Sequence, residues 1–236
     1  MRFLRLNAFA VRLAQIVVLS VAFTTGLLAD TITIGAPGDG LNAFPFGGKD
    51  TVNPGTRYQQ AYASTAFGST EPMLITSISF LNGNGGTFAT SQYGFFLSTI
   101  PAGIDTLSVF NFDGNRGLDN TLFASPTLTG SSPITLTITG GAPFLYDPSQ
   151  GNLLMDIVVT PGGVTPAASP VGYSSRQGTA NGIFSRYHNF GFATIGFGLV
   201  TQFEFTPVPQ TVPEPSTVVL LGAGLLGIAC YPLRRG

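Results

Sequence analysis

Apolar and polar residues alternate in short stretches through the middle of the chain. The clearest case is residues 134–139, where three aliphatic side chains alternate with three threonines, as expected of a strand with one buried face. Turn-forming clusters, such as residues 82–86 and 161–163, separate these stretches. The pattern predicts an all-β fold, a jelly-roll-like β-sandwich. Strands are expected at residues 31–34, 74–80, 93–98, 107–110, 134–139, 153–159, 194–200 and 202–205.

Composition favours strands over helices. The strong helix formers lysine and glutamate amount to four residues, whereas threonine alone reaches 27. One stretch, residues 58–66 between Gly55 and Gly68, is compatible with a helix of a turn or two. Charged residues make up 9% of the chain, well below the roughly 25% of an ordinary soluble domain. This low charge favours a location outside the cytosol.

The first 29 residues have the order of a secretory signal peptide. Arg2, Arg5 and Arg12 come first, residues 13–28 are largely apolar, and Ala29 stands just before the polar Asp30. This order predicts cleavage by signal peptidase between Ala29 and Asp30. An uncleaved N-terminal membrane anchor is the alternative, because Leu27, three residues before the cut, is larger than signal peptidase prefers.

The other end of the chain has three parts. Pro213, Glu214 and Pro215 precede an apolar run at residues 217–231, and Arg234 and Arg235 follow it. Fifteen helical residues span about 22 Å, short of the roughly 30 Å hydrocarbon core of a bilayer. The run predicts a short, marginal transmembrane helix, with the arginine pair as a stop-transfer signal on the cytoplasmic side.

This tail resembles the PEP-CTERM sorting signal through Pro213, Glu214, Pro215, the glycine-rich apolar helix and the terminal arginine pair. The resemblance implies that residues 208–236 are a sorting signal recognised by an exosortase, which cuts at or near the Pro-Glu-Pro motif. It further implies an inner-membrane intermediate, followed by release or transfer to the cell surface or an exopolysaccharide matrix.

Between the two signals, residues 30–207 are expected to form one domain. It carries five basic and ten acidic residues, and the single cysteine, Cys230, lies in the tail, so no disulfide is expected. With a single lysine there is no basic patch that could neutralise phosphates, which excludes nucleic acid as a partner. The domain resembles a β-rich type that recurs among PEP-CTERM proteins and brings no known activity; the resemblance lies in residues 57–62, 97–99, 144–148 and 151–157.

The sequence points to no catalytic residue. His188 is the only histidine, so any Ser-His-Asp scheme would have to combine it with Ser174, Ser175 or Ser185. The chain lacks a G-x-S-x-G elbow, and a solvated loop histidine is the better interpretation. Asp147 and Asp156 are expected to be structural, one in a turn and one in a strand. A pair of carboxylates for glycoside hydrolysis stays open.

Residues 113–120 place oxygen-bearing side chains at alternating positions, as calcium loops do. The candidate ligands are Asp113, Asn115 and Asp119. The twelfth loop position, where an EF-hand needs glutamate, is Ala124, and Arg116 puts a cation inside the loop. A turn held by hydrogen bonds of the Asp and Asn side chains is therefore expected, with no metal and no cofactor, and calcium is kept as the alternative.

These observations predict an exported, exosortase-processed protein with a structural or adhesive role at the cell surface or in an exopolysaccharide matrix, and no enzymatic activity. The first alternative is a carbohydrate-binding, lectin-like module. Without tryptophan, its sugar-binding face would use Tyr58, Tyr62, Tyr173 and Tyr187. A secreted hydrolase is the third possibility.

Overall fold

The structure is a computed structural model that describes residues 29–36, 41–46, 56–81, 83–161, 171, 173–177, 184–188 and 192–208. The predicted signal peptide before Ala29, the Pro-Glu-Pro motif and the apolar run at 217–231 lie outside these residues. Within the described part of the chain, no helix is long and apolar enough to cross a membrane.

The described residues form β-strands joined by turns and three short 3₁₀ helices. The strands are β1 (Asp30–Ile34), β2 (Leu41–Asn42), β3 (Thr56–Tyr62), β4 (Met73–Leu81), β5 (Thr87–Ile100), β6 (Thr121–Ala124), β7 (Thr127–Ser131), β8 (Thr135–Tyr146), β9 (Asn152–Pro161), β10 (Tyr173–Gln177), β11 (Phe184–His188), β12 (Phe192–Ile195), β13 (Phe197–Leu199) and β14 (Thr201–Pro207). The 3₁₀ helices are η1 (Ser64–Phe67), η2 (Asp113–Asn115) and η3 (Pro148–Gln150).

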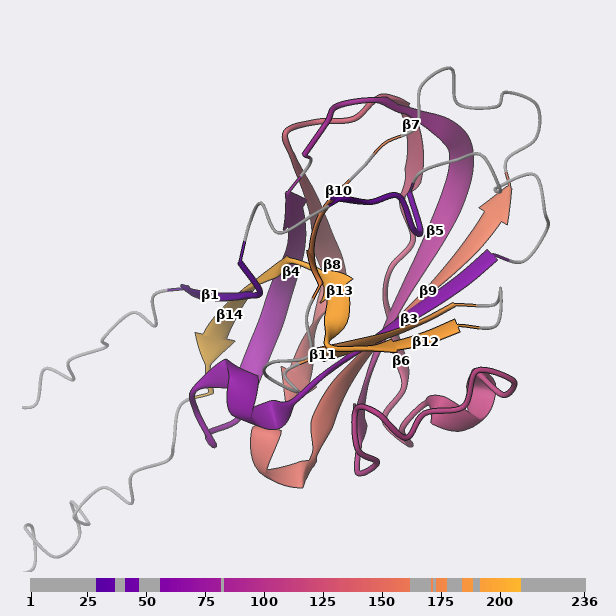
Figure 1. Cartoon of the computed structure of the whole chain (residues 1–236). Coiled ribbons are helices and arrows are strands. Elements are labelled where there is room, and N and C mark those ends of the chain that lie inside the picture. Colours follow the sequence, from indigo (N-terminus) through magenta and orange to yellow (C-terminus); the bar gives the residue numbers. More distant parts are fainter. Residues whose placement is uncertain are drawn as a thin grey trace, which may run out of the picture.

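Antiparallel sheets form the sandwich (Figure 1). The four-stranded sheet has the order β1-β14-β4-β8, and the seven-stranded sheet has the order β12-β11-β3-β9-β5-β6, with β7 also paired to β5. A further three-stranded sheet has the order β13-β10-β2. The prediction of an all-β sandwich is confirmed.

The core lies between the two large sheets because each contributes its apolar, alternating positions to the interior. The four-stranded sheet contributes Ile78 and Phe80 of β4, and the seven-stranded sheet contributes Phe95 and Leu97 of β5. All four side chains are fully buried in the main core. Phe46 joins the layers: its ring lies 5.2 Å from Phe80 between centroids and 4.8 Å from Tyr173. Such aromatic pairs contribute stability in addition to that gained from the area that each ring buries.

Two local predictions are wrong. Residues 58–66 form most of β3 followed by η1, because β3 pairs on one side with β9 and on the other with β11. Residues 107–110 form no strand; they belong to the connection between β5 and β6, where Leu107 is buried and Phe110 is exposed.

Candidate functional site

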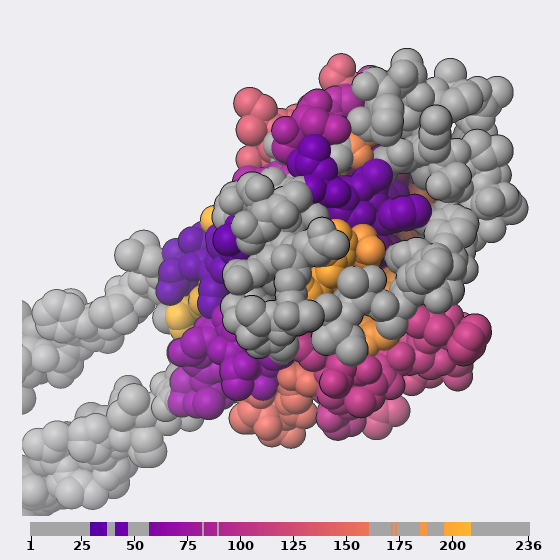
Figure 2. All heavy atoms as spheres, in the orientation of Figure 1, coloured from indigo at the N-terminus to yellow at the C-terminus, as the bar shows by residue number. Residues whose placement is uncertain are grey.

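A long connection, residues 101–120, folds over the outer face of the seven-stranded sheet and is called here the 101–120 loop. It runs from the end of β5 to the start of β6 and includes η2. Figure 2 shows it as a protruding part of the surface, in magenta at the lower right. Apolar side chains of the loop and the sheet form a second, smaller core beneath it: Ala61, Ile100, Ile104, Leu107, Phe112, Leu154 and Tyr187.

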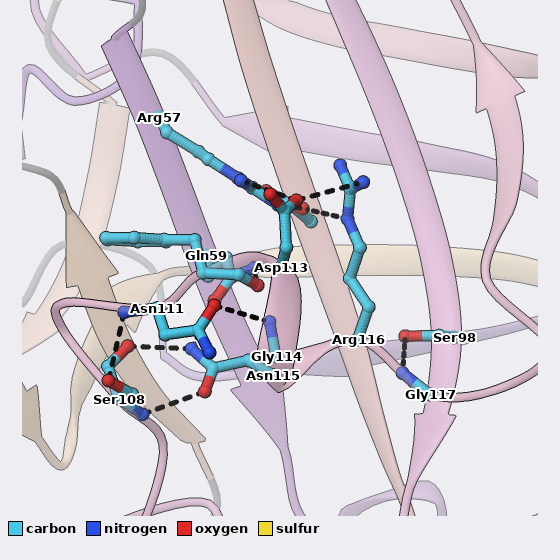
Figure 3. A network of polar contacts seen from close by, with 12 residues as sticks. Arg57, Gln59, Ser98, Ser108, Asn111, Asp113, Gly114, Asn115, Arg116 and Gly117 are labelled. Atoms are coloured by element: carbon cyan, nitrogen blue, oxygen red, sulfur yellow. Dashed lines mark hydrogen bonds and ion pairs between the residues drawn. The ribbon is translucent and has the colours of Figure 1, made fainter.

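Two arginines and two aspartates fasten this loop to the sheet (Figure 3). Asp156 of β9 is 1% exposed, and Arg57 of β3 binds it through two hydrogen bonds, Nε to Oδ1 at 2.9 Å and Nη2 to Oδ2 at 2.6 Å. Arg116 of the loop donates from Nε to the same Oδ2 at 2.6 Å. Asp113 of the loop accepts from Arg57 at 2.9 Å and lies 3.4 Å from Arg116. The four charges sum to zero.

The pKa shifts agree with this pairing. The hydrogen bond from Arg57, followed by its charge, lowers the pKa of the exposed Asp113 carboxyl below its ordinary value of 3.8. Burial alone would lower the pKa of the Arg57 guanidinium, but its hydrogen bonds to Asp156 and Asp113 outweigh burial, and the net pKa is raised. Each arginine also lies over an aromatic ring, Arg57 over Phe112 and Arg116 over Phe96, the latter at 4.5 Å.

A set of neutral hydrogen bonds fixes the interior of the loop (Figure 3). Asn115, buried in η2, donates to Gln59 Oε1 and to the Ser108 carbonyl, both at 2.8 Å, and accepts from the Ser108 N–H. Gln59 in turn donates to the Phe112 carbonyl. Asn111 accepts from the Gly114 N–H. Buried polar groups satisfied in this way hold a loop in one conformation.

The last part of the loop lies directly on strand β5. The Gly117 N–H donates to Ser98 Oγ at 3.1 Å, and Asp119 Oδ1 accepts from the Thr99 N–H at 2.8 Å. A Cβ at position 117 would come within 1.9 Å of the Thr99 carbonyl oxygen, so only glycine allows this approach.

The three predicted calcium ligands each have a different partner. Asp113 binds the two arginines, Asn115 binds Gln59 and Ser108, and Asp119 binds the backbone of Thr99. Within the described residues, no group of three or more histidine, cysteine, aspartate or glutamate side chains could hold a metal ion. Of the hydrogen bonds expected between Asp or Asn side chains and loop backbone groups, those of Asn111 and Asn115 are present, whereas Asp113 and Asp119 bind partners outside or across the loop.

The structure places the candidate serines and His188 on two strands of different sheets, and the side chains of His188, Ser174 and Ser175 lie outside the part it describes. His188 and Ser185 lie in β11, which pairs with β3 and β12, whereas Ser174 and Ser175 lie in β10, which pairs with β2 and β13. Ser185 Oγ is buried. Asp147 caps η3 by accepting from Ser149, and Asp156 lies in β9, in agreement with their expected structural roles.

The tyrosines expected on a sugar-binding face are buried. Tyr58, Tyr62, Tyr173 and Tyr187 all have 0% exposure. Burial raises the pKa of Tyr173 to about 12 and that of Tyr58 still further. These four residues therefore cannot form an exposed aromatic platform: Tyr58, Tyr62 and Tyr173 belong to the main core, and Tyr187 belongs to the smaller core under the 101–120 loop.

The Asp113 pair predicts a pH dependence. Because the folded-state pKa of Asp113 lies below its unfolded value, near 3.8, the pair contributes stability above that value and loses it as the pH falls through the lower folded pKa. We expect the melting temperature of the exported protein to exceed that of Asp113→Asn at neutral pH and the difference to vanish in acid. Thermal melts across this range check it; a difference independent of pH would contradict it.

The comparisons with known proteins concern mainly the tail. The family model of the PEP-CTERM protein-sorting motif matches residues 211–235, a range that contains Pro213, Glu214, Pro215, Arg234 and Arg235. No curated protein matches the sequence. The solved structure titled "Structure of infectious bursal disease virus Gt strain" aligns over 89% of this chain and 53% of that chain, with 12% identity and a TM-score of 0.23.

The chain therefore spans about half of that viral chain, and a similarity this low carries no argument about fold or function. The motif does. Residues 211–235 are a PEP-CTERM protein-sorting motif, which implies that the chain is exported and is processed at the membrane by an exosortase.

Proposed function

We propose that the processed protein is a non-catalytic structural or adhesive component of the cell surface or of an exopolysaccharide matrix. The sorting motif supports export and exosortase processing. The adhesive role is proposed from the polar side chains on the outer face of the four-stranded sheet. This surface is called here the hydroxyl face.

The hydroxyl face consists of two rows of polar side chains that cross all four strands. The register of β1, β14, β4 and β8 aligns four residues in each row. One row is Thr31, Glu204, Ser77 and Thr139, and the other is Thr33, Gln202, Ser79 and Thr137. Neighbours within the rows are bonded: Ser77 Oγ to Glu204 Oε2 and Ser79 Oγ to Thr137 Oγ1, both at 2.8 Å.

This chemistry suits a polyhydroxylated partner. Hydroxyl groups both donate and accept hydrogen bonds, as do the hydroxyls of a polysaccharide, and Glu204 is the one charged side chain in the two rows. Adjacent strands lie about 4.8 Å apart. The two central serines are buried, at 4% and 7% exposure, so the groups open to an extended chain are the four threonines, which are exposed, with Gln202 and Glu204, which are half-buried. Each hydrogen bond contributes little on its own, about 0.5–1.5 kcal/mol net, but many made together hold a long polymer.

The triple variant Thr33→Ala/Thr137→Ala/Thr139→Ala tests the hydroxyl face. We expect it to be exported and processed normally but to bind its host's purified exopolysaccharide about tenfold more weakly, because three lost hydrogen bonds at about 0.5 kcal/mol each amount to one factor of ten. Co-sedimentation of the exported protein with the polysaccharide measures this.

The matched control is Thr127→Ala/Thr129→Ala/Thr160→Ala, which removes three exposed threonines from strands of the seven-stranded sheet. It should bind as the natural protein does. Equal loss in both triple variants, or no association of the natural protein with the polysaccharide, would refute the proposal.

A further inference from the structure

The 101–120 loop encloses an open hollow against the end of β5. Its volume is about 680 Å³, within the range of roughly 300–1,000 Å³ typical of small-ligand sites. Polar side chains of Thr106, Asp119 and Gln150 line it together with apolar Pro101 and Leu118. It lies on the opposite side of the sandwich from the hydroxyl face, because the loop covers the outer face of the seven-stranded sheet.

The walls of the hollow are held in place before any ligand arrives. One wall is fixed by Arg116 bound to Asp156 and by the bonds of Gly117 and Asp119 to β5. The other is fixed by Ser108, bound to Asn115. The floor, at the end of β5, is fixed by the hydrogen bond from Asn152 to the Ala102 carbonyl. A ligand that enters such a site orders few groups, so little affinity is lost to conformational entropy.

The charges around the hollow disfavour an anionic ligand. Arg116 is its one cationic lining residue, and this guanidinium is already bound to Asp156 and Asp113. Asp119 lines the hollow and Asp105 lies on the same loop, both exposed. A neutral ligand that donates hydrogen bonds fits this balance, because carboxylate and amide oxygens accept them.

The lining also contains exposed apolar surface. Leu118 is fully exposed at the hollow, beside a lining that mixes hydroxyl, amide and carboxylate groups with proline. A sugar ring offers the complementary surfaces, with C–H groups on its faces and hydroxyls around its edge. When such a face covers an exposed leucine on a fixed loop, apolar surface leaves the water, and this favours binding.

We infer that this hollow binds a neutral sugar unit of an extracellular polysaccharide. The inference rests on the proposed function and adds a second contact to it. The hydroxyl face holds a chain along its length, and the hollow selects the sugar. Because the two sites lie on opposite faces of the sandwich, one molecule can contact polysaccharide on both sides.

A glycan array of immobilised neutral and anionic oligosaccharides, probed with the exported and processed protein, tests the inference. We expect binding to neutral glycans. Leu118→Ala should weaken it about tenfold, since it removes apolar surface that the sugar covers, and Gln150→Ala should weaken it several-fold. Both side chains are exposed, so neither substitution should disturb the fold, and circular dichroism and melting curves verify this.

Two matched controls distinguish binding in the hollow from nonspecific binding to exposed apolar side chains. Phe110→Ala removes an exposed apolar side chain from the same loop that does not line the hollow, and Ile134→Ala removes one between β7 and β8. Both should bind as the natural protein does. Equal loss in Phe110→Ala would assign binding to the loop tip and overturn the inference.

The inference is also overturned if only anionic glycans bind, if no glycan binds, or if Leu118→Ala and Gln150→Ala both keep full binding. Its failure is distinguishable from failure of the proposed function. If the natural protein still sediments with its host's polysaccharide, the adhesive role stands without the hollow; if it does not, the adhesive role itself fails.

Discussion

Replacing Asp156 with alanine should lower the free energy of unfolding by about 3 kcal/mol. Asp156 is 1% exposed and neutralises both Arg57 and Arg116. Its removal takes from two partly buried guanidinium groups the buried carboxylate that they share, and breaking a buried ion pair from one side costs about 3–5 kcal/mol. The lower end applies because the two arginine side chains are 16% and 21% exposed. Urea denaturation of the exported protein measures the loss.

Two controls identify the cause of this loss. Asp156→Asn keeps the shape and part of the hydrogen bonding but removes the charge, and it should be intermediate. Asp113→Ala removes the exposed partner of the same arginines and should destabilise far less, since solvent screens exposed pairs. If both aspartate-to-alanine variants lost the same stability, the buried position of Asp156 would not be the source of its effect.

Replacing Pro213, Glu214 and Pro215 with alanine should abolish release of the protein. The family match places these residues in the sorting motif, and prolines on both sides of Glu214 keep the segment extended and separate from a following helix. An extended backbone is what a protease-like cleft binds. The variant should still cross the inner membrane but stay there with residues 217–236 attached. Fractionation and intact-mass analysis of the trapped protein measure this.

A matched control alters prolines outside the motif. Pro207→Ala/Pro209→Ala leaves the Pro-Glu-Pro motif intact and should be released with the normal mass. If the motif variant were released at the normal rate and with the normal mass, the Pro-Glu-Pro residues would not be what the processing enzyme recognises.

The strands that could be predicted are those whose pattern is local. β4, β8 and β14 alternate clearly, and the structure places strands there. β3 was not predicted because residues four apart, such as Tyr58 and Tyr62, share a face in a helix and in a strand alike. Its strand form depends on β9 and β11, which are distant in the sequence. Residues 107–110 lack such a neighbour and instead bond to Asn115.

The charged cluster of the candidate site could not be predicted for the same reason. Arg57 and Asp156 are separated by 99 residues, and only the pairing of β3 with β9 brings them together. The sequence did indicate that residues 113–119 form a loop around Arg116, and the structure places Asp113 against that side chain. A signal was available in Asp156 itself, a single acid within the otherwise apolar residues 153–159, because such a residue needs a cationic partner.

The pairing of β1 with β14 joins the two ends of the domain, with Asp30 opposite Phe205 (Figure 1). In a chain that leaves the cell N-terminus first, β1 emerges early and β14 is the last strand to arrive. The four-stranded sheet therefore closes only when residues 201–207 have crossed the membrane. Pro213 follows Pro207 by six residues, a reach of about 20 Å at most. The Pro-Glu-Pro motif therefore crosses directly after the last strand, and cleavage there leaves β14, the strand that closes the sheet, in the released protein.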